Sequence, residues 1–252
     1  MSRTVLAAAT FACLVGCTAE PEVGQQDAAA TPVRRLLLCQ QGLSDRTLGW
    51  DKGLFALCES VEDAGFELVW DGDYPAFGAL DEDGAYEALF EALDTNGDGG
   101  VDDGDQRTAV HLVGFSWGGI NVTDLAKRLN RDDRVAWWRR GVSGMVLLDP
   151  FQPQVSRSVI PSNVLDAWVY RQTETTSGDC SIEASLGFGF NGHRPKALND
   201  DTFCTHYDLD RFRDGVGHCD VPTVARKAAF ENLVRHRDYA PWADWAESCP
   251  LE

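Results

Sequence analysis

TAVHLVGFSWGG, at residues 108–119, is the stretch that decides the fold. Its first half is a short apolar run with β character, and the residues from 118 to about 129 are expected to form a helix. Ser116 therefore lies on a sharp turn between a strand and a helix. Gly114 and Gly118 flank it, because residues without side-chain bulk are needed where strand and helix crowd together. The same turn points the helix N-terminus, with its dipole and its N–H groups, towards the serine.

Strands and helices alternate along the rest of the chain. Short apolar strands separated by helices indicate a parallel sheet that is covered on both faces. Residues 177–217 are rich in Gly, Asp and Asn and break this alternation, so we expect a long irregular loop there, with Phe188-Gly189-Phe190 in its middle. The expected strands are residues 34–39, 66–70, 108–113, 143–148 and 163–170, and the expected helices are residues 52–63, 87–93, 118–129 and 221–236.

Length and composition are those of one globular α/β domain. The chain has 252 residues, 44% hydrophobic and 25% charged, which leaves little room for a second full domain. Its formal net charge of −18 argues against a nucleic-acid-binding protein, because phosphate backbones require patches of Lys and Arg. An acidic surface favours solubility, divalent cations or an electropositive partner.

Residues 1–16 are expected to be a signal peptide, because an apolar run that is too short to span a bilayer follows Arg3. Leu14-Val15-Gly16-Cys17 resembles the lipobox of bacterial lipoproteins. The resemblance implies cleavage before Cys17, lipidation of its thiol, and an exported protein of the outer membrane, periplasm or cell surface. The alternative is a simple secretory peptide that is cleaved after a small residue. Residues 17–32 would form a flexible tether, and residues 33–252 one domain.

If the protein is exported, its remaining cysteines are expected to form disulfides. Once Cys13 and Cys17 are set aside, six cysteines remain, and an even number in an oxidising compartment suggests disulfides. The sequence cannot choose among the pairings, and some of these residues could be buried thiols. Order along the chain suggests the pairs Cys39–Cys58, Cys180–Cys204 and Cys219–Cys249.

The motif Gly-x-Ser-x-Gly between a strand and a helix resembles the nucleophile elbow of the α/β-hydrolase superfamily, in its lipase, esterase and thioesterase branches. The resemblance covers about residues 34–236 and is specific only at the elbow and at the candidate acid and histidine. It implies a three-layer α/β sandwich with a mostly parallel central sheet, and acyl transfer through Ser116. A structural alternative is a hydrolase-like scaffold that has lost its activity.

A serine nucleophile needs a base, and five histidines are available. His218 lies on a glycine-rich loop before the last expected helix, which is where hydrolases of this fold carry their base. His206 is the alternative base, and His193 lies in the same irregular loop. His111 is expected to pack inside its strand, and His236 to be a solvated residue at a helix end.

Asp149 is the favoured acid, because it follows the strand at residues 143–148 and would reach the same sheet edge as the elbow. Leu-Asp-Pro at this place is similar to the pancreatic-lipase branch. Other branches place the acid one strand later, which here would be Glu174 or Asp179. Asp149 could also be a turn residue before Pro150.

The oxyanion hole implied by the resemblance uses the N–H of Trp117 and one N–H from the loop after the first strand. Gln41 or Leu43 would supply that second donor. The His-Gly pair that is usual in the family is absent from this loop, which leaves a reduced or different activity open.

Residues 94–105, DTNGDGGVDDGD, form the most specific motif of the chain. Oxygen ligands at this spacing, with Gly99 at the sharp turn, are typical of a calcium loop. Its last ligand is Asp rather than Glu, which resembles the dockerin version of the loop. The alternative is a solvated acidic surface turn. We expect structural Ca²⁺ bound by Asp94, Asn96, Asp98, the carbonyl of Gly100, Asp102 and Asp105.

These features together predict a monomeric, membrane-anchored serine hydrolase. It would cleave an ester, lipid-ester or thioester bond, with Ser116 as nucleophile, His218 as base and Asp149 as orienting acid. The sequence carries no nucleotide, nicotinamide or flavin motif, so no organic cofactor is expected. The alternative function is a non-catalytic, lipid-anchored, calcium-binding surface protein on a hydrolase scaffold.

Overall fold

The computed structural model describes residues 33–43, 53–74, 82–151, 159–173, 192, 194–236 and 246–251. Several sequence predictions fall outside these residues. They are the signal peptide, the lipidation of Cys17, the tether, the alternative acids Glu174 and Asp179, His193, and the segment 188–190. Within the described residues, no helix is long and apolar enough to cross a bilayer.

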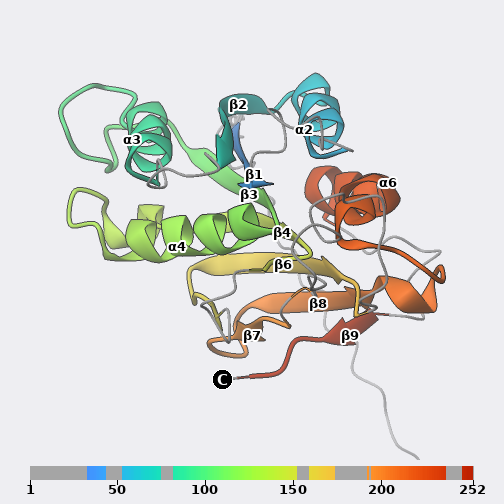
Figure 1. Ribbon diagram of the computed structural model, residues 1–252. Helices are drawn as coiled ribbons and strands as arrows, with labels where there is room; N and C mark the ends of the chain where they lie inside the picture. The colour runs from blue at the N-terminus through green and yellow to red at the C-terminus, as the bar shows by residue number, and fades with distance from the viewer. Residues whose placement is uncertain are drawn as a thin grey trace, which may run out of the picture. The chain divides into compact units, whose positions relative to one another are not determined.

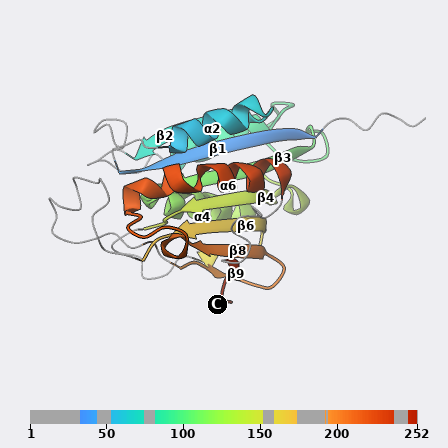
Figure 2. The ribbon, with the colours of Figure 1, turned by 90° about the vertical axis from the view of Figure 1, so that its right-hand side faces the viewer.

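A seven-stranded sheet organises the described residues, in the order β2-β1-β3-β4-β6-β8-β9. Its strands pair in parallel except for β9, which runs antiparallel to β8 (Figure 2). The strands are β1 (Arg34–Leu43), β2 (Glu67–Tyr74), β3 (Thr108–Phe115), β4 (Val142–Leu148), β6 (Val164–Arg171), β8 (Phe203–Asp208) and β9 (Ala246–Ser248); β5 (Val159–Ile160) and β7 (Lys196–Ala197) form a separate small sheet.

Two pairs of helices cover the two faces of the sheet (Figure 1). Helices α3 (Glu82–Leu93) and α4 (Trp117–Arg131) pack on one face through side chains such as Leu89 and Leu125. Helices α2 (Leu54–Asp63) and α6 (Val221–Arg235) pack on the other through side chains such as Leu57 and Leu233. The predicted three-layer sandwich with a mostly parallel sheet is confirmed.

The parallel strands end in register at one edge of the sheet. Phe115 pairs with Leu148, Leu148 pairs with Tyr170, and Tyr170 pairs with Tyr207. Residues that follow these strands therefore meet at this edge, which we call the carboxyl edge. The opposite edge, where the same strands begin, is the amino edge.

The prediction of an irregular loop over residues 177–217 is wrong in its second half. β8 lies there, between β6 and β9, and two short 3₁₀ helices follow it at Leu209–Arg211 and His218–Asp220. The sequence of β8, FCTHYD, begins with two apolar residues and continues with mainly polar ones, so it has no long apolar run. Tertiary pairing with two neighbouring strands, rather than local propensity, makes it a strand.

Candidate active site

Ser116 occupies the tight turn between β3 and α4. Its backbone has φ 55° and ψ −124°, a left-handed conformation that is rare for a residue with a side chain. Hydrogen bonds hold the turn from both sides: the Ser116 amide donates to the Leu148 carbonyl at 3.0 Å, and the Gly119 amide donates to the Ser116 carbonyl at 3.0 Å. The strained residue of the motif is therefore the candidate nucleophile.

Close backbone contacts explain the two glycines of the motif. A Cβ atom on Gly114 would lie 2.4 Å from the carbonyl oxygen of Gly118. A Cβ atom on Gly118 would lie 2.1 Å from the carbonyl oxygen of Gln40 in β1. Both distances are far below van der Waals contact, so strand and helix can approach this closely only where side chains are absent.

Ser116, His218 and Asp149 form one chain of hydrogen bonds at the carboxyl edge. His218 Nε2 lies 2.8 Å from Ser116 Oγ, and His218 Nδ1 lies 2.6 Å from Asp149 Oδ2. All three side chains are buried, and they come from the ends of β3 and β4 and from the 3₁₀ helix that precedes α6. This arrangement can move a proton from the hydroxyl to the imidazole while the carboxylate stabilises the imidazolium.

Asp149 is held by the backbone and by Gln172. It has φ 43°, and its amide donates to the Tyr170 carbonyl at 2.6 Å. Asp149 Oδ1 accepts from the Gln172 amide at 2.9 Å, and Asp149 Oδ2 accepts from Gln172 Nε2 at 3.2 Å. Gly192 packs so closely that a Cβ on it would lie 2.0 Å from Asp149 Oδ1. The carboxylate is therefore fixed before any substrate arrives.

Two aromatic rings confine the His218 imidazole. The Phe115 ring centroid lies 4.9 Å from that of His218, and the Phe151 centroid lies 6.2 Å away in an edge-on orientation. Apolar rings on this side chain limit its rotation and exclude water from the hydrogen-bonded chain.

The proposed oxyanion donors lie beside Ser116. Trp117 is the first residue of α4, and Gln41 is near the end of β1. A Cβ on Gly118 would lie 2.4 Å from the Gln41 carbonyl oxygen, so the end of β1 borders the elbow. Leu43, the other candidate for the second donor, ends the same strand. Their function as donors remains a proposal.

The other described histidines lie elsewhere. His111 is buried in β3, and burial is the main cause that lowers its pKa to about 4. His206, the alternative base, is buried in β8, where burial and nearby arginines lower its pKa to about 3. His236 follows α6, and its Nδ1 lies 3.3 Å from Asp166 Oδ2. His218 is the histidine that contacts Ser116.

The disulfides differ from the predicted pairing. Cys39–Cys58 is present, as predicted, and links β1 to α2. Cys204 is bonded to Cys249, so the predicted pairs Cys180–Cys204 and Cys219–Cys249 are wrong. Cys219 is also disulfide-bonded. Adjacent strands β8 and β9 bring Cys204 and Cys249 together, a contact that chain order alone does not reveal. Disulfides persist in oxidising compartments, in agreement with an exported protein.

The acidic loop (residues 94–105) connects α3 to β3 at the amino edge, and its first carboxylates accept hydrogen bonds from its own backbone. Asp94 Oδ1 accepts from the amides of Gly97 at 2.8 Å and Asp98 at 3.2 Å, and its Oδ2 accepts from Gly99 at 2.9 Å. Asp98 Oδ2 accepts from Asn96 Nδ2 at 3.0 Å. Asp98 Oδ1 accepts from the amide of Gly100, the residue predicted to offer its carbonyl to calcium, at 3.0 Å.

The end of the acidic loop closes on Asp105. Its carboxylate accepts from the amides of Thr95 at 2.7 Å, Asn96 at 3.2 Å and Asp102 at 2.8 Å. Burial alone would raise the pKa of Asp105, but these hydrogen bonds together lower it. Among the residues that the structure describes, no three Asp, Glu, His or Cys side chains are gathered to hold a metal ion. Calcium binding by this loop therefore stays a prediction.

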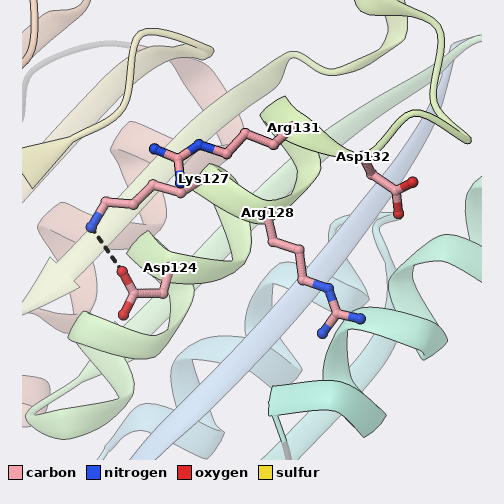
Figure 3. A pocket seen from close by; sticks show the side chains of 5 residues that line it. All are labelled: Asp124, Lys127, Arg128, Arg131 and Asp132. Carbon is pink, nitrogen blue, oxygen red and sulfur yellow. Dashed lines mark hydrogen bonds and ion pairs between the residues drawn. The ribbon is translucent and has the colours of Figure 1, made fainter.

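A pocket of about 500 Å³ lies along the C-terminal half of α4 (Figure 3), whereas Ser116 precedes the first residue of this helix. Its charges are largely paired. Lys127 Nζ contacts Asp124 at 2.8 Å, and Arg128 contacts Asp83 at 2.6 Å. The pocket is thus separate from the hydrogen-bonded chain at the carboxyl edge. Its lining residues are Asp124, Lys127, Arg128, Arg131 and Asp132.

Gln172 and Gly192 are site residues that sequence reasoning did not find. Gln172 directly follows β6, the neighbour of β4, so a correct strand order would place it beside Asp149. Gly192 lies on a segment without secondary structure, and no feature of the sequence ties it to Asp149.

Comparison with known proteins finds structural likeness but no family. No family model and no curated protein matches the chain. The crystal structure of a predicted CIB-like hydrolase from Thermoplasma acidophilum aligns with a TM-score of 0.38 and 17% identity, over 80% of this chain and 86% of that one. A likeness of this size carries no argument about activity, which has to come from the geometry of the site.

Proposed function

We propose that the protein is a serine hydrolase that cleaves an ester, lipid-ester or thioester bond through an acyl-enzyme on Ser116. One observation carries the proposal: the buried Ser116–His218–Asp149 chain of hydrogen bonds, built on two strained backbone turns. Strain of this kind persists only where the surrounding structure enforces it, and it is concentrated at functional sites.

In the proposed reaction, Ser116 Oγ attacks the carbonyl carbon of the substrate while His218 Nε2 takes the hydroxyl proton. Asp149 orients the imidazole and stabilises its charged form. The amides of Trp117 and Gln41 are the proposed donors to the oxyanion. His218 then gives its proton to the leaving alcohol or thiol, and a water molecule releases the acid by the same steps in reverse order.

Covalent labelling tests this proposal. A fluorophosphonate probe reacts with an activated serine, so the wild-type chain should be labelled and hydrolyse p-nitrophenyl esters or an acyl thioester. Ser116→Ala should lose the label and about 10⁴-fold or more of the activity. Ser60→Ala is the matched control, since Ser60 lies on α2 and donates to the Ala56 carbonyl at 2.6 Å. Persistent labelling of Ser116→Ala would exclude the proposal, and an inert wild-type chain would favour the non-catalytic alternative.

We infer in addition that the acidic loop takes up structural Ca²⁺. The support is the spacing of the oxygen ligands together with a fixed backbone, because the Val101 amide donates to the Arg134 carbonyl at 2.8 Å and the Ala136 amide donates to the Val101 carbonyl at 2.9 Å. Binding would require the carboxylates to turn from amides to the ion, since Asp94 and Asp98 are engaged with the loop itself.

Calorimetric titration with Ca²⁺ tests this inference, with heat and a rise in Tm as readouts. Asp98→Ala removes the side-chain oxygens of a predicted ligand and should abolish both. Asp103→Ala makes the same truncation at a position that is not a predicted ligand, and should keep both. No heat in the wild-type chain, or an equal loss in the two variants, would overturn the inference.

A further inference from the structure

Exposed hydrophobic side chains of the described residues gather at the amino edge of the sheet, opposite Ser116. Trp137 is 76% exposed and Trp138 51% exposed, both in the 3₁₀ helix Trp137–Arg139 that precedes β4. Five other exposed apolar residues lie at or next to the first residues of strands at this edge: Val33, Leu165, Leu198, Phe203 and Leu251.

Hydrogen bonds link the 3₁₀ helix that carries the tryptophan pair to the residues beside the start of β1. Arg139 Nη1 donates to the Gln106 carbonyl at 3.3 Å, and the Arg34 amide donates to the carbonyl of the next residue, Arg107, at 3.0 Å. The chain therefore enters the fold beside the tryptophan pair. Residues 1–32, which precede this point, contain the predicted lipid attachment site at Cys17.

We propose that the amino edge docks on the surface of a phospholipid bilayer, with Trp137 and Trp138 inserted at the level of the headgroups. Tryptophan is enriched at membrane interfaces because its ring is apolar and its N–H is polar. Arg139 and Arg140 follow the pair directly, and their guanidinium groups donate to backbone carbonyls of residues 105, 106, 130 and 135, so the insertion rests on the two tryptophans. In this orientation the carboxyl edge, with Ser116, faces away from the membrane.

A fluid bilayer fits this edge better than a second protein does. The exposed residues are spread over the starts of several strands, whereas a stable protein interface requires a contiguous, complementary surface of roughly 1,200 Å² or more. The acidic loop lies beside the pair, since Trp138 Nε1 donates to Asp103 Oδ1 at 3.1 Å. With a net charge of −18, the chain should prefer zwitterionic to anionic lipid.

Co-sedimentation with phosphatidylcholine vesicles tests the proposal. The mature chain, residues 17–252, carries Cys17→Ser, so that association comes from neither an acyl chain nor the apolar signal peptide. Trp137→Ser combined with Trp138→Ser should lower the partition coefficient about tenfold or more, since burying about 60 Å² of apolar surface is equivalent to about a factor of ten. Trp137→Ser alone keeps the bond from Trp138 to Asp103 and should lower it partly.

Phe212→Ser is the matched control. Phe212 is 42% exposed and follows β8 at the carboxyl edge, so its loss should leave vesicle binding unchanged. Circular dichroism and Tm measurements identify variants that fail to fold. Absence of vesicle binding by the Cys17→Ser chain at millimolar lipid would overturn the proposal, as would an equal loss in Phe212→Ser.

Analytical ultracentrifugation tests the alternative occupant of this edge. A dimer that Trp137→Ser dissociates, in a chain that does not bind vesicles, would assign the edge to a second copy. None of these outcomes depends on hydrolase activity.

Discussion

The two edges of the sheet both carry carboxylates, but they hold them by different means. At the carboxyl edge, Asp149 is buried and contacts Gln172 and His218, which are 23 and 69 residues away in sequence. At the amino edge, Asp94 and Asp98 are bonded to amides two to five residues away. The first arrangement exists only when the sheet has formed, whereas the second is a property of the local sequence. Substitutions at the two edges should therefore have different consequences.

The largest expected difference concerns an isosteric loss of charge. Asp149→Asn should lower kcat for ester hydrolysis about 10⁴-fold, because the amide favours the wrong tautomer of His218 and cannot stabilise its charged form. Asp98→Asn makes the same change in the acidic loop and should leave kcat within about twofold, because that loop lies far from the reacting atoms along the strands. Equal losses in the two variants would contradict the separation of the edges.

The same contrast explains what the sequence could predict. The elbow, the acidic loop and the position of His218 before α6 are local patterns that a single segment carries. His218 and Ser116 could thus be named as the candidate base and nucleophile before their contact was known. Asp149 required one further step, the rule that residues after parallel strands meet at one edge.

The remaining features depend on contacts between distant segments. β8 has a polar sequence and becomes a strand because β6 and β9 pair with it, and the Cys204–Cys249 bond follows from the same pairing. Gln172 could be placed only from the strand order. The close approach of Gly192 to Asp149 depends on tertiary packing that no local pattern reports.

Replacing a glycine with alanine at each edge should lower the stability by different amounts. Gly118→Ala would put a Cβ 2.1 Å from the Gln40 carbonyl, and should lower the free energy of unfolding by about 3 kcal/mol as well as the activity. Gly99→Ala in the acidic loop has open space around its Cβ and φ +87°, so only backbone strain of about 1 kcal/mol is expected. Urea denaturation of the two variants measures both values. A Gly118→Ala chain as stable as Gly99→Ala would show that β1 and α4 can separate without penalty.

The stability of the fold should depend on pH in two different ranges, one set by His111 in the sheet and one by Asp105 in the acidic loop. The folded pKa of His111, about 4, lies below its ordinary value of about 6.5, so the unfolded chain binds more protons between these values. Stability should therefore fall by about 2 kcal/mol as the pH decreases from 7 to 5, through His111 alone. Asp105, whose pKa is lowered, loses its contribution only at and below its ordinary pKa of about 4.

Urea denaturation at several pH values measures this dependence. His111→Leu should make the dependence between pH 7 and 5 about half as steep, because His206, whose pKa is also lowered, contributes over the same interval. Asp105→Asn should leave that interval unchanged while altering the dependence below pH about 4. If Asp105→Asn instead flattened the upper interval, the assignment of the two pH ranges would be wrong.

The smallest expected effect comes from Gln172, which orients the Asp149 carboxylate without changing its charge. Gln172 Nε2 donates to Asp149 Oδ2 at 3.2 Å, the same oxygen that faces His218. Gln172→Met keeps the length of the side chain and the backbone bond to Asp149 Oδ1 but removes this donor. Loss of one hydrogen bond of about 1 kcal/mol should lower kcat about fivefold, with KM unchanged.

Gln106→Met makes the same chemical change at the amino edge. The backbone N–H of Gln106 donates to Thr95 Oγ1 at 2.8 Å. That backbone bond survives the substitution, so kcat should not change. A fall in kcat with Gln172→Met and not with Gln106→Met would place Gln172 in the support of Asp149. A rise in KM with unchanged kcat would instead place Gln172 against the substrate, because a group that only orients the acid acts on the chemical step and not on binding.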